Sequence, residues 1–130
     1  MSAKRPLPRR VVDAIDRSKM LSIRAGAEHR FIGIWAVVVE RRVFVRSWSL
    51  KARSWYRAFL EEPAGAIRIG GRALAIRAVR TRGERLRDAV SRAYLEKYST
   101  PGSLKYAKDL GRKRSREATI EIVLPPSEAR

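Results

Sequence analysis

The chain has 130 residues, no cysteine, 30 lysines and arginines, and 13 acidic residues, which gives a formal net charge of +17. The length fits one domain, and the lack of cysteine excludes disulfides, thiolate metal ligands and cysteine nucleophiles. The apolar run at residues 31–39 is too short to cross a bilayer, and the basic N-terminus lacks the apolar core of a signal peptide. We therefore expect a cytoplasmic domain over residues 1–130, with residues 1–9 as a loose basic tail.

The positive charge would attract polyanions such as nucleic acid, anionic lipid or phosphorylated ligands. Arginine outnumbers lysine, as it does in proteins from GC-rich genomes, and the cations are spread over the whole length. The charge therefore points to a class of partners without identifying one.

The first half of the chain reads as a helix followed by three strands. Apolar spacing predicts a helix over residues 10–18 and a strand over 20–26. Residues 30–39 are β-branched and aromatic, which predicts a long and mostly buried strand. A tight turn at 40–42 returns the chain into a strand at 43–48, so the last two strands form a hairpin.

The middle of the chain predicts a helix and a second hairpin. Ser54 is a suitable N-cap for a helix over 55–62, which Pro63 ends. Strands at 66–69 and 73–79 are joined by Gly70-Gly71, because glycines tolerate the positive φ angles of a tight hairpin turn.

The last part of the chain predicts helices at 83–98 and 103–110 and a final alternating strand at 117–124. The total is about six strands with short connections, which favour antiparallel pairing. We predict an α+β fold, a small and mostly antiparallel split β-barrel with flanking helices.

The order of several short segments resembles a known family. These segments are "IWAVVV", "VFVRSWS", "RSWYRAFLEEP", "IRIGG", a helix with "YLEKY", and "ATIEIVLP". Over roughly residues 20–124 the chain resembles the uncharacterised bacterial family called domain of unknown function 2255. It is more distantly similar to split-barrel flavin-binding proteins, especially the deazaflavin-dependent, nitroreductase-like group. The resemblance implies a split barrel, commonly dimeric, that holds the phosphate of FMN or a deazaflavin after its third strand.

Basic and hydroxyl side chains gather where that strand meets the helix at 55–62. The candidate phosphate ligands are Arg46, Ser47, Ser49, Lys51 and Arg53. Guanidinium, ammonium and hydroxyl groups beside a helix N-terminus are the donors that a phosphate requires. The alternative interpretation is an ordinary solvated loop. The candidate apolar walls of a pocket are Trp35, Trp48 and Trp55, for which plain core packing is the alternative.

Two features argue against zinc binding or triad catalysis, and a third weakens the flavin prediction. His29 is the only histidine, and without cysteine it cannot build a zinc site of the usual kind. No spacing supports a catalytic Ser-His-Asp set. Residues 26–30 stand where the flavin-binding group has a Gly-Lys-Ser-like segment, and here they include the acidic Glu28.

The sequence therefore favours binding of a phosphorylated flavin or deazaflavin, with any oxidoreductase chemistry supplied by the cofactor. A cofactor-free binding or structural protein on the same scaffold is the first alternative. The second is a nucleic-acid-binding module that uses Lys105, Lys108 and Arg112, although such a run of charges is usually only a solvent-exposed surface.

A homodimer is also expected. The resemblance implies it, and the run at 31–39 is apolar on both faces, so its outer face needs a cover. Either the helices of this chain or a second copy would supply that cover.

Overall fold

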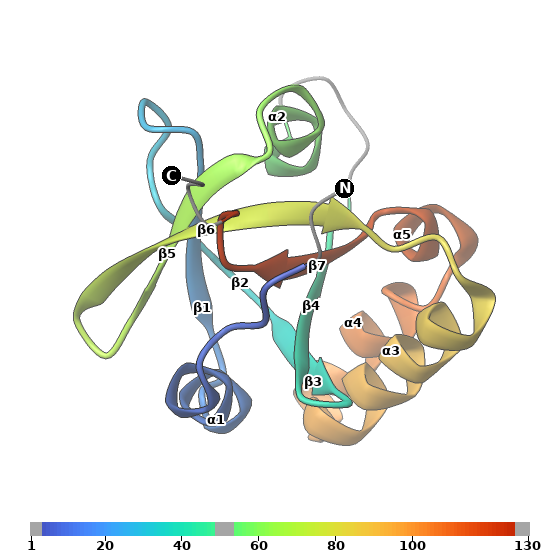
Figure 1. Ribbon diagram of the computed structural model, residues 1–130. Coiled ribbons are helices and arrows are strands. Elements are labelled where there is room, and N and C mark those ends of the chain that lie inside the picture. Colours follow the sequence, from blue (N-terminus) through green and yellow to red (C-terminus); the bar gives the residue numbers. More distant parts are fainter. Residues whose placement is uncertain (1–3, 49–53, 127–130) are drawn as a thin grey trace.

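The computed structural model describes residues 4–48 and 54–126 (Figure 1). The strands are β1 (Leu21–Ala25), β2 (Ile32–Ile34), β3 (Ala36–Val39), β4 (Arg42–Arg46), β5 (Ala64–Ile69), β6 (Arg72–Arg80) and β7 (Thr119–Val123). The helices are α1 (Arg9–Arg17), α2 (Trp55–Glu61), α3 (Glu84–Lys97), α4 (Pro101–Asp109) and α5 (Lys113–Glu117). The fold is thus α+β, as predicted.

All seven strands pair antiparallel in one sheet of order β2-β1-β5-β6-β7-β4-β3. The strand predicted at 30–39 is two strands, because at Trp35 the chain leaves its partner β1 and begins to pair with β4. β2 and β3 are therefore the two edge strands of the sheet, although one residue separates them in sequence. This change of partner brings the two edges together into a nearly closed barrel.

Alternate residues of the strands fill the barrel. Ile23, Ile67 and Val45 are completely buried, and Ile76 and Ile120 are 1% exposed. This is the period-two pattern of strands with one face in a core. Burial of such aliphatic side chains contributes about 1.5–3 kcal/mol each to the stability of the fold.

A second core lies outside the barrel, between the sheet and helices α3 and α4. Val37 and Phe44 point outward from β3 and β4, and they pack with Val90 and Tyr94 of α3 and with Leu110. In Figure 1 these helices lie together on one side of the sheet. Helix α3 of this chain therefore covers the outer apolar face of residues 36–39. Of the two covers expected from the sequence, the chain's own helices supply this one, and not a second copy.

The two predicted hairpin turns adopt the same left-handed backbone conformation. Gly70 and Gly71 have φ angles of 58° and 79°, and Glu40 and Arg41 have φ angles of 54° and 64°. Glycine adopts this conformation without strain, whereas side chains with a Cβ atom rarely do. The conformation of the Gly70-Gly71 turn could be predicted from its sequence, whereas for the turn at Glu40 and Arg41 only the position could be predicted.

The helix ends follow mostly from local chemistry. Ser54 caps α2 as predicted, because its hydroxyl accepts a hydrogen bond from the Arg57 N–H. Pro101 stands at the first position of α4, where a proline costs no hydrogen bond. α5 was not predicted, since its sequence KRSRE has no apolar periodicity. Within residues 4–48 and 54–126, no helix is long and apolar enough to cross a membrane.

Candidate functional site

Arg46, the first of the predicted phosphate ligands, lies at the end of β4 under the helices and is 2% exposed. Its guanidinium donates four hydrogen bonds of 2.6–2.8 Å, to Thr119 Oγ1, Ser91 Oγ and the carbonyl oxygens of Leu110 and Arg87. These acceptors belong to β7, α3 and the residue that follows α4. Arg46 therefore ties the sheet to two helices, and its burial and four internal hydrogen bonds leave only one N–H uncommitted.

The acceptors around Arg46 are neutral. Burial lowers the pKa of Arg46 to about 10, while the nearby Tyr94 has the opposite effect. Burial also raises the pKa of Tyr94 well above its ordinary value. The Tyr94 hydroxyl accepts from the Arg46 N–H at 3.1 Å and donates to the Trp35 carbonyl at 2.8 Å. This network fixes the end of β4 relative to the break between β2 and β3.

Four aromatic rings meet beside this network, and we call Trp35, Trp48, Tyr98 and Tyr106 the aromatic cluster. Trp35 stacks on Tyr98 with ring centroids 3.9 Å apart and planes 2° apart. The Trp48 and Tyr106 rings meet Trp35 edge-on at 5.8 Å and 6.5 Å, and they lie 6.4 Å from each other. Such offset and edge-on pairs contribute about 0.5–1.5 kcal/mol each beyond burial.

The outer rings of the cluster are open to solvent. Trp48 and Tyr106 are each 45% exposed, although both are large apolar side chains. The ammonium of Lys105 lies 5.1 Å from the Tyr106 ring centroid. Tyr98 is held from behind, since its hydroxyl donates to the Lys19 carbonyl at 2.7 Å. The cluster is therefore an apolar surface with a fixed inner layer and a cation at its rim.

The structure brings together only some of the predicted site residues. Trp35 and Trp48 belong to the aromatic cluster, whereas Trp55 packs against Phe59 of α2 at 6.2 Å and against the barrel core. Ser47 is 2% exposed. The predicted ligands Ser49, Lys51 and Arg53 lie outside the described residues.

The predicted basic stripe is interrupted. Lys105 and Lys108 lie on α4, but that helix ends at Asp109, and Arg112 lies beyond it with its Nε 3.2 Å from the Asp109 carboxylate. Arg116 of α5 pairs with Asp88 and Glu84 of α3 at 2.6 and 2.8 Å. Carboxylates of this chain thus neutralise Arg112 and Arg116. Among the described residues, no group of three histidine, cysteine or acidic side chains could hold a metal ion.

Sequence reasoning missed Tyr98 and Tyr106 as partners of Trp35 and Trp48. Tyr98 ends the helix predicted at 83–98, and Tyr106 occupies a polar stretch of α4 without a clear apolar stripe. A single surface tyrosine is an ordinary feature of a helix, so the sequence offered no signal, and only the contiguous patch that the structure assembles marks the surface.

The fold and the site define a small split-barrel-like protein with an exposed aromatic surface at one end of the barrel. Over residues 11–122 the sequence matches the family described as "Uncharacterized protein conserved in bacteria (DUF2255)", and the chain belongs to that family. Its structure is similar to the crystal structure of the conserved hypothetical protein Rv2991 from Mycobacterium tuberculosis. The TM-score is 0.58 at 10% identity, over 98% of this chain and 86% of that one. No curated protein matches the sequence.

Proposed function

We propose that this protein binds a planar phosphorylated cofactor of the flavin or deazaflavin class, with the cofactor ring against Trp48 and Tyr106. The observation that carries the proposal is the exposure of these two rings, 45% each, on an inner layer fixed by the Trp35–Tyr98 stack. A planar ring that covers them would remove apolar surface from water and stack on preorganised partners. A bound flavin would supply hydride chemistry, and the chain would supply orientation.

The aromatic cluster suits a flavin ring better than Arg46 suits its phosphate. Because the Arg46 guanidinium is buried and donates to protein acceptors, the proposal leaves it out of the phosphate contacts. Lys105 at the rim of the cluster, with its ammonium 5.1 Å from the Tyr106 ring centroid, is a described cation beside the exposed rings. Ser49, Lys51 and Arg53 remain candidates on sequence grounds, since they follow Trp48 directly.

Fluorescence titrations with FMN and riboflavin would test the proposal. We expect FMN to bind and Trp48→Ala to weaken its binding about tenfold, the scale of one lost stacking partner. Leu95→Ala is the matched control, because Leu95 is an exposed apolar residue of α3 outside the cluster. Equal FMN affinity in the Trp48 variant and the wild type, or no FMN binding at all, would contradict the proposal.

The phosphate contacts can be tested separately. The double substitution Lys51→Ala with Arg53→Ala should remove the preference for FMN over riboflavin and leave riboflavin binding unchanged. If the preference persists, the phosphate binds elsewhere, and the ring contact is not affected by that result.

Nucleic acid is the second candidate, and the aromatic cluster is the observation that favours it. Exposed Trp48 and Tyr106 beside Lys105 form the kind of stacking and cationic surface that single strands use. Binding that depends only on the net charge of +17 should weaken steeply between low and physiological salt and show no sequence preference. Tight, sequence-selective retention of RNA at physiological salt, lost in Trp48→Ala, would place this function first.

The homodimer also remains a proposal. Ile32 on edge strand β2 is 40% exposed, Met20 beside it is 48% exposed, and a second copy could cover both. Light scattering across a salt series should show a dimer that strengthens as salt screens the repulsion between two chains. Ile32→Lys should shift the protein to monomer, and a wild-type monomer at physiological salt would contradict the proposal.

A further inference from the structure

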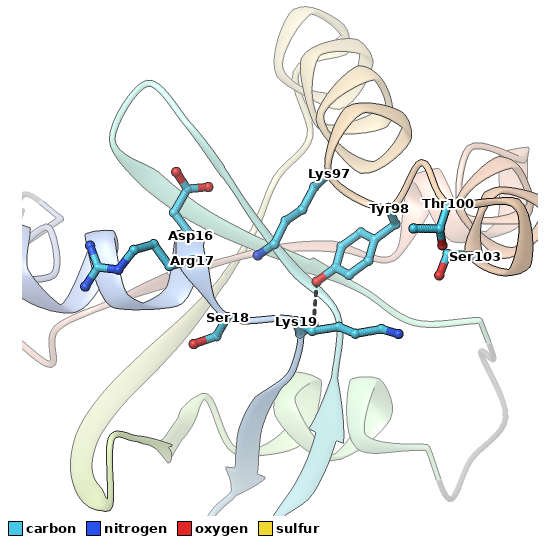
Figure 2. Close-up of a pocket in the computed structure, with 8 residues that line it drawn as sticks. All are labelled: Asp16, Arg17, Ser18, Lys19, Lys97, Tyr98, Thr100 and Ser103. Carbon is cyan, nitrogen blue, oxygen red and sulfur yellow. Dashed lines mark hydrogen bonds between the residues drawn. The ribbon is translucent and has the colours of Figure 1, made fainter.

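A cavity of about 350 Å³ lies between the end of α1, the start of β1 and the junction of α3 with α4. Figure 2 shows the side chains around it, which come from segments far apart in the sequence. It is lined by Asp16, Arg17, Ser18, Lys19, Lys97, Tyr98, Thr100 and Ser103. Its volume is within the range of sites for small molecules and exceeds the size of a phosphate group.

The charge of this cavity is positive. Arg17, Lys19 and Lys97 line it against the single carboxylate of Asp16. The Lys97 ammonium donates to the carbonyl oxygens of Ile15 at 3.0 Å and Ala36 at 2.7 Å. An ammonium has a further N–H for a ligand. Burial lowers the pKa of Lys97, and Asp16 opposes that effect.

Ser103 supplies a polar group that lacks a partner. It is 7% exposed, it lines the cavity, and within residues 4–48 and 54–126 its hydroxyl has no hydrogen bond. In Figure 2 the hydroxyl points out of α4 on the side where the Lys19 side chain lies. The hydroxyl oxygen is not completely buried, so water can reach it, and a phosphate oxygen that accepts its hydrogen bond would replace that water with a stronger, charge-assisted partner.

The start of α4 adds the positive end of a helix dipole, although Pro101 has no N–H and the N–H groups of Ser103 and Leu104 donate to the Thr100 carbonyl. The helix has nine residues, its N-cap Thr100 makes no side-chain capping bond, and its first turn contains no acidic residue. The positive end of the helix dipole therefore faces the cavity without an internal counter-charge, next to the hydroxyls of Thr100 and Ser103.

We propose that this cavity binds the phosphate group of a small phosphate monoester. The phosphate accepts from the hydroxyls of Ser103 and Thr100 at the start of α4 and is neutralised by Lys19 and Lys97. The Tyr98 ring forms an apolar wall for the organic part of the ligand. This site shares Tyr98 with the aromatic cluster but does not use the proposed flavin contacts Trp48 and Tyr106, so separate variants test the two proposals.

Calorimetric titrations with inorganic phosphate and phenyl phosphate at fixed ionic strength test the proposal. We expect phenyl phosphate to bind more tightly than inorganic phosphate, and Ser103→Ala to weaken both about tenfold, the effect of one hydrogen bond to a charged group. Removing a hydroxyl without a partner should not lower the melting temperature. Ser99→Ala is the matched control, since Ser99 is exposed, lies just before Thr100 and does not line the cavity.

A second pair of variants separates the cavity from the general positive field. Lys19→Met and Lys108→Met remove the same charge, but only Lys19 lines the cavity, while Lys108 is exposed on α4. Lys19→Met should weaken phenyl phosphate binding at least fivefold more than Lys108→Met. Equal effects of the two lysine variants, or equal affinity in Ser103→Ala and Ser99→Ala, would overturn the proposal. Tighter binding of benzoate than of phenyl phosphate would overturn its assignment to phosphate.

Discussion

Strand β4 carries an arginine at each end, and the two are held in different ways. Arg42, at the hairpin end, donates to the Glu121 carboxylate at 3.0 and 2.8 Å, and Lys4 donates to the same carboxylate at 2.9 Å. Arg46, at the other end, donates to neutral hydroxyls and to main-chain carbonyls. Both side chains lie on the outer face of the barrel, next to the same strand β7.

The difference decides which arginine can be replaced. A carboxylate can be removed together with its cation, and an apolar pair in its place is often as stable as a buried ion pair. The carbonyl oxygen of Leu110 cannot be removed by mutation, so the loss of Arg46 leaves it without its donor, and the carbonyl of Arg87 within α3 loses its second one. Arg46 is thus part of the scaffold at the site end of β4, although its sequence context resembles that of a ligand.

Substitution of Arg46 should therefore have the largest effect. We expect Arg46→Met to lower the free energy of unfolding by about 3–5 kcal/mol, because several buried acceptors lose their donor at once. Urea denaturation would measure it, with Arg92→Met on the exposed face of α3 as a control near zero. A loss below about 1 kcal/mol would show that the acceptors find other donors.

Substitution at the hairpin end should cause a smaller loss of stability, and a second substitution should restore most of it. Arg42→Met should lower the free energy of unfolding by about 1–3 kcal/mol, since Glu121 is 4% exposed and keeps only Lys4 as a partner. Adding Glu121→Leu should recover most of that loss. If the double variant is as unstable as Arg42→Met alone, the proposed contrast between the two ends of β4 is wrong.

The same pair predicts a pH dependence confined to the hairpin end. Burial alone would raise the pKa of Glu121, but hydrogen bonds from Arg42 and Lys4 outweigh it, and the pKa is below its ordinary value. The stability that this carboxylate contributes is therefore complete above its unfolded-state pKa and is lost as the pH falls through the lowered folded-state value. Glu121→Gln should show a shallower loss of stability in acid than the wild type, measured by urea denaturation between neutral pH and pH about 3. Identical pH profiles would exclude a role for Glu121 in acid sensitivity.

The smallest expected effect is at the turn that precedes Arg42. Arg41 has a φ angle of 64°, a conformation that favours glycine, so Arg41→Gly should raise the free energy of unfolding by about 0.5 kcal/mol. Thermal unfolding would detect it as a rise in melting temperature. Arg72→Gly, at an exposed strand position after Gly71, should lower stability instead. A fall in both variants would show that side-chain contacts of Arg41 matter more than its backbone conformation.

The sequence by itself was sufficient to predict most helices and strands and the barrel class. Alternation of residue types marks β1 and β7, Gly70-Gly71 marks a hairpin, and Ser54 marks the start of α2. These are local signals, because they depend on alternation, on capping and on the φ angles that glycine allows. The resemblance to the family was likewise carried by the order of short segments along the chain.

Only the tertiary structure decided how those elements build the candidate site. The run at 30–39 gave no local sign that Trp35 is where the chain changes from β1 to β4, since pairing partners lie far away in sequence. From the sequence Arg46 looks like a free cation, but its role depends on acceptors of α3, of β7 and of Leu110 after α4, which no spacing within residues 43–63 encodes. The aromatic cluster and the cavity at the start of α4 are likewise assembled from distant segments. Such contacts are set by how the barrel closes and which face each helix covers, and local propensity contains neither.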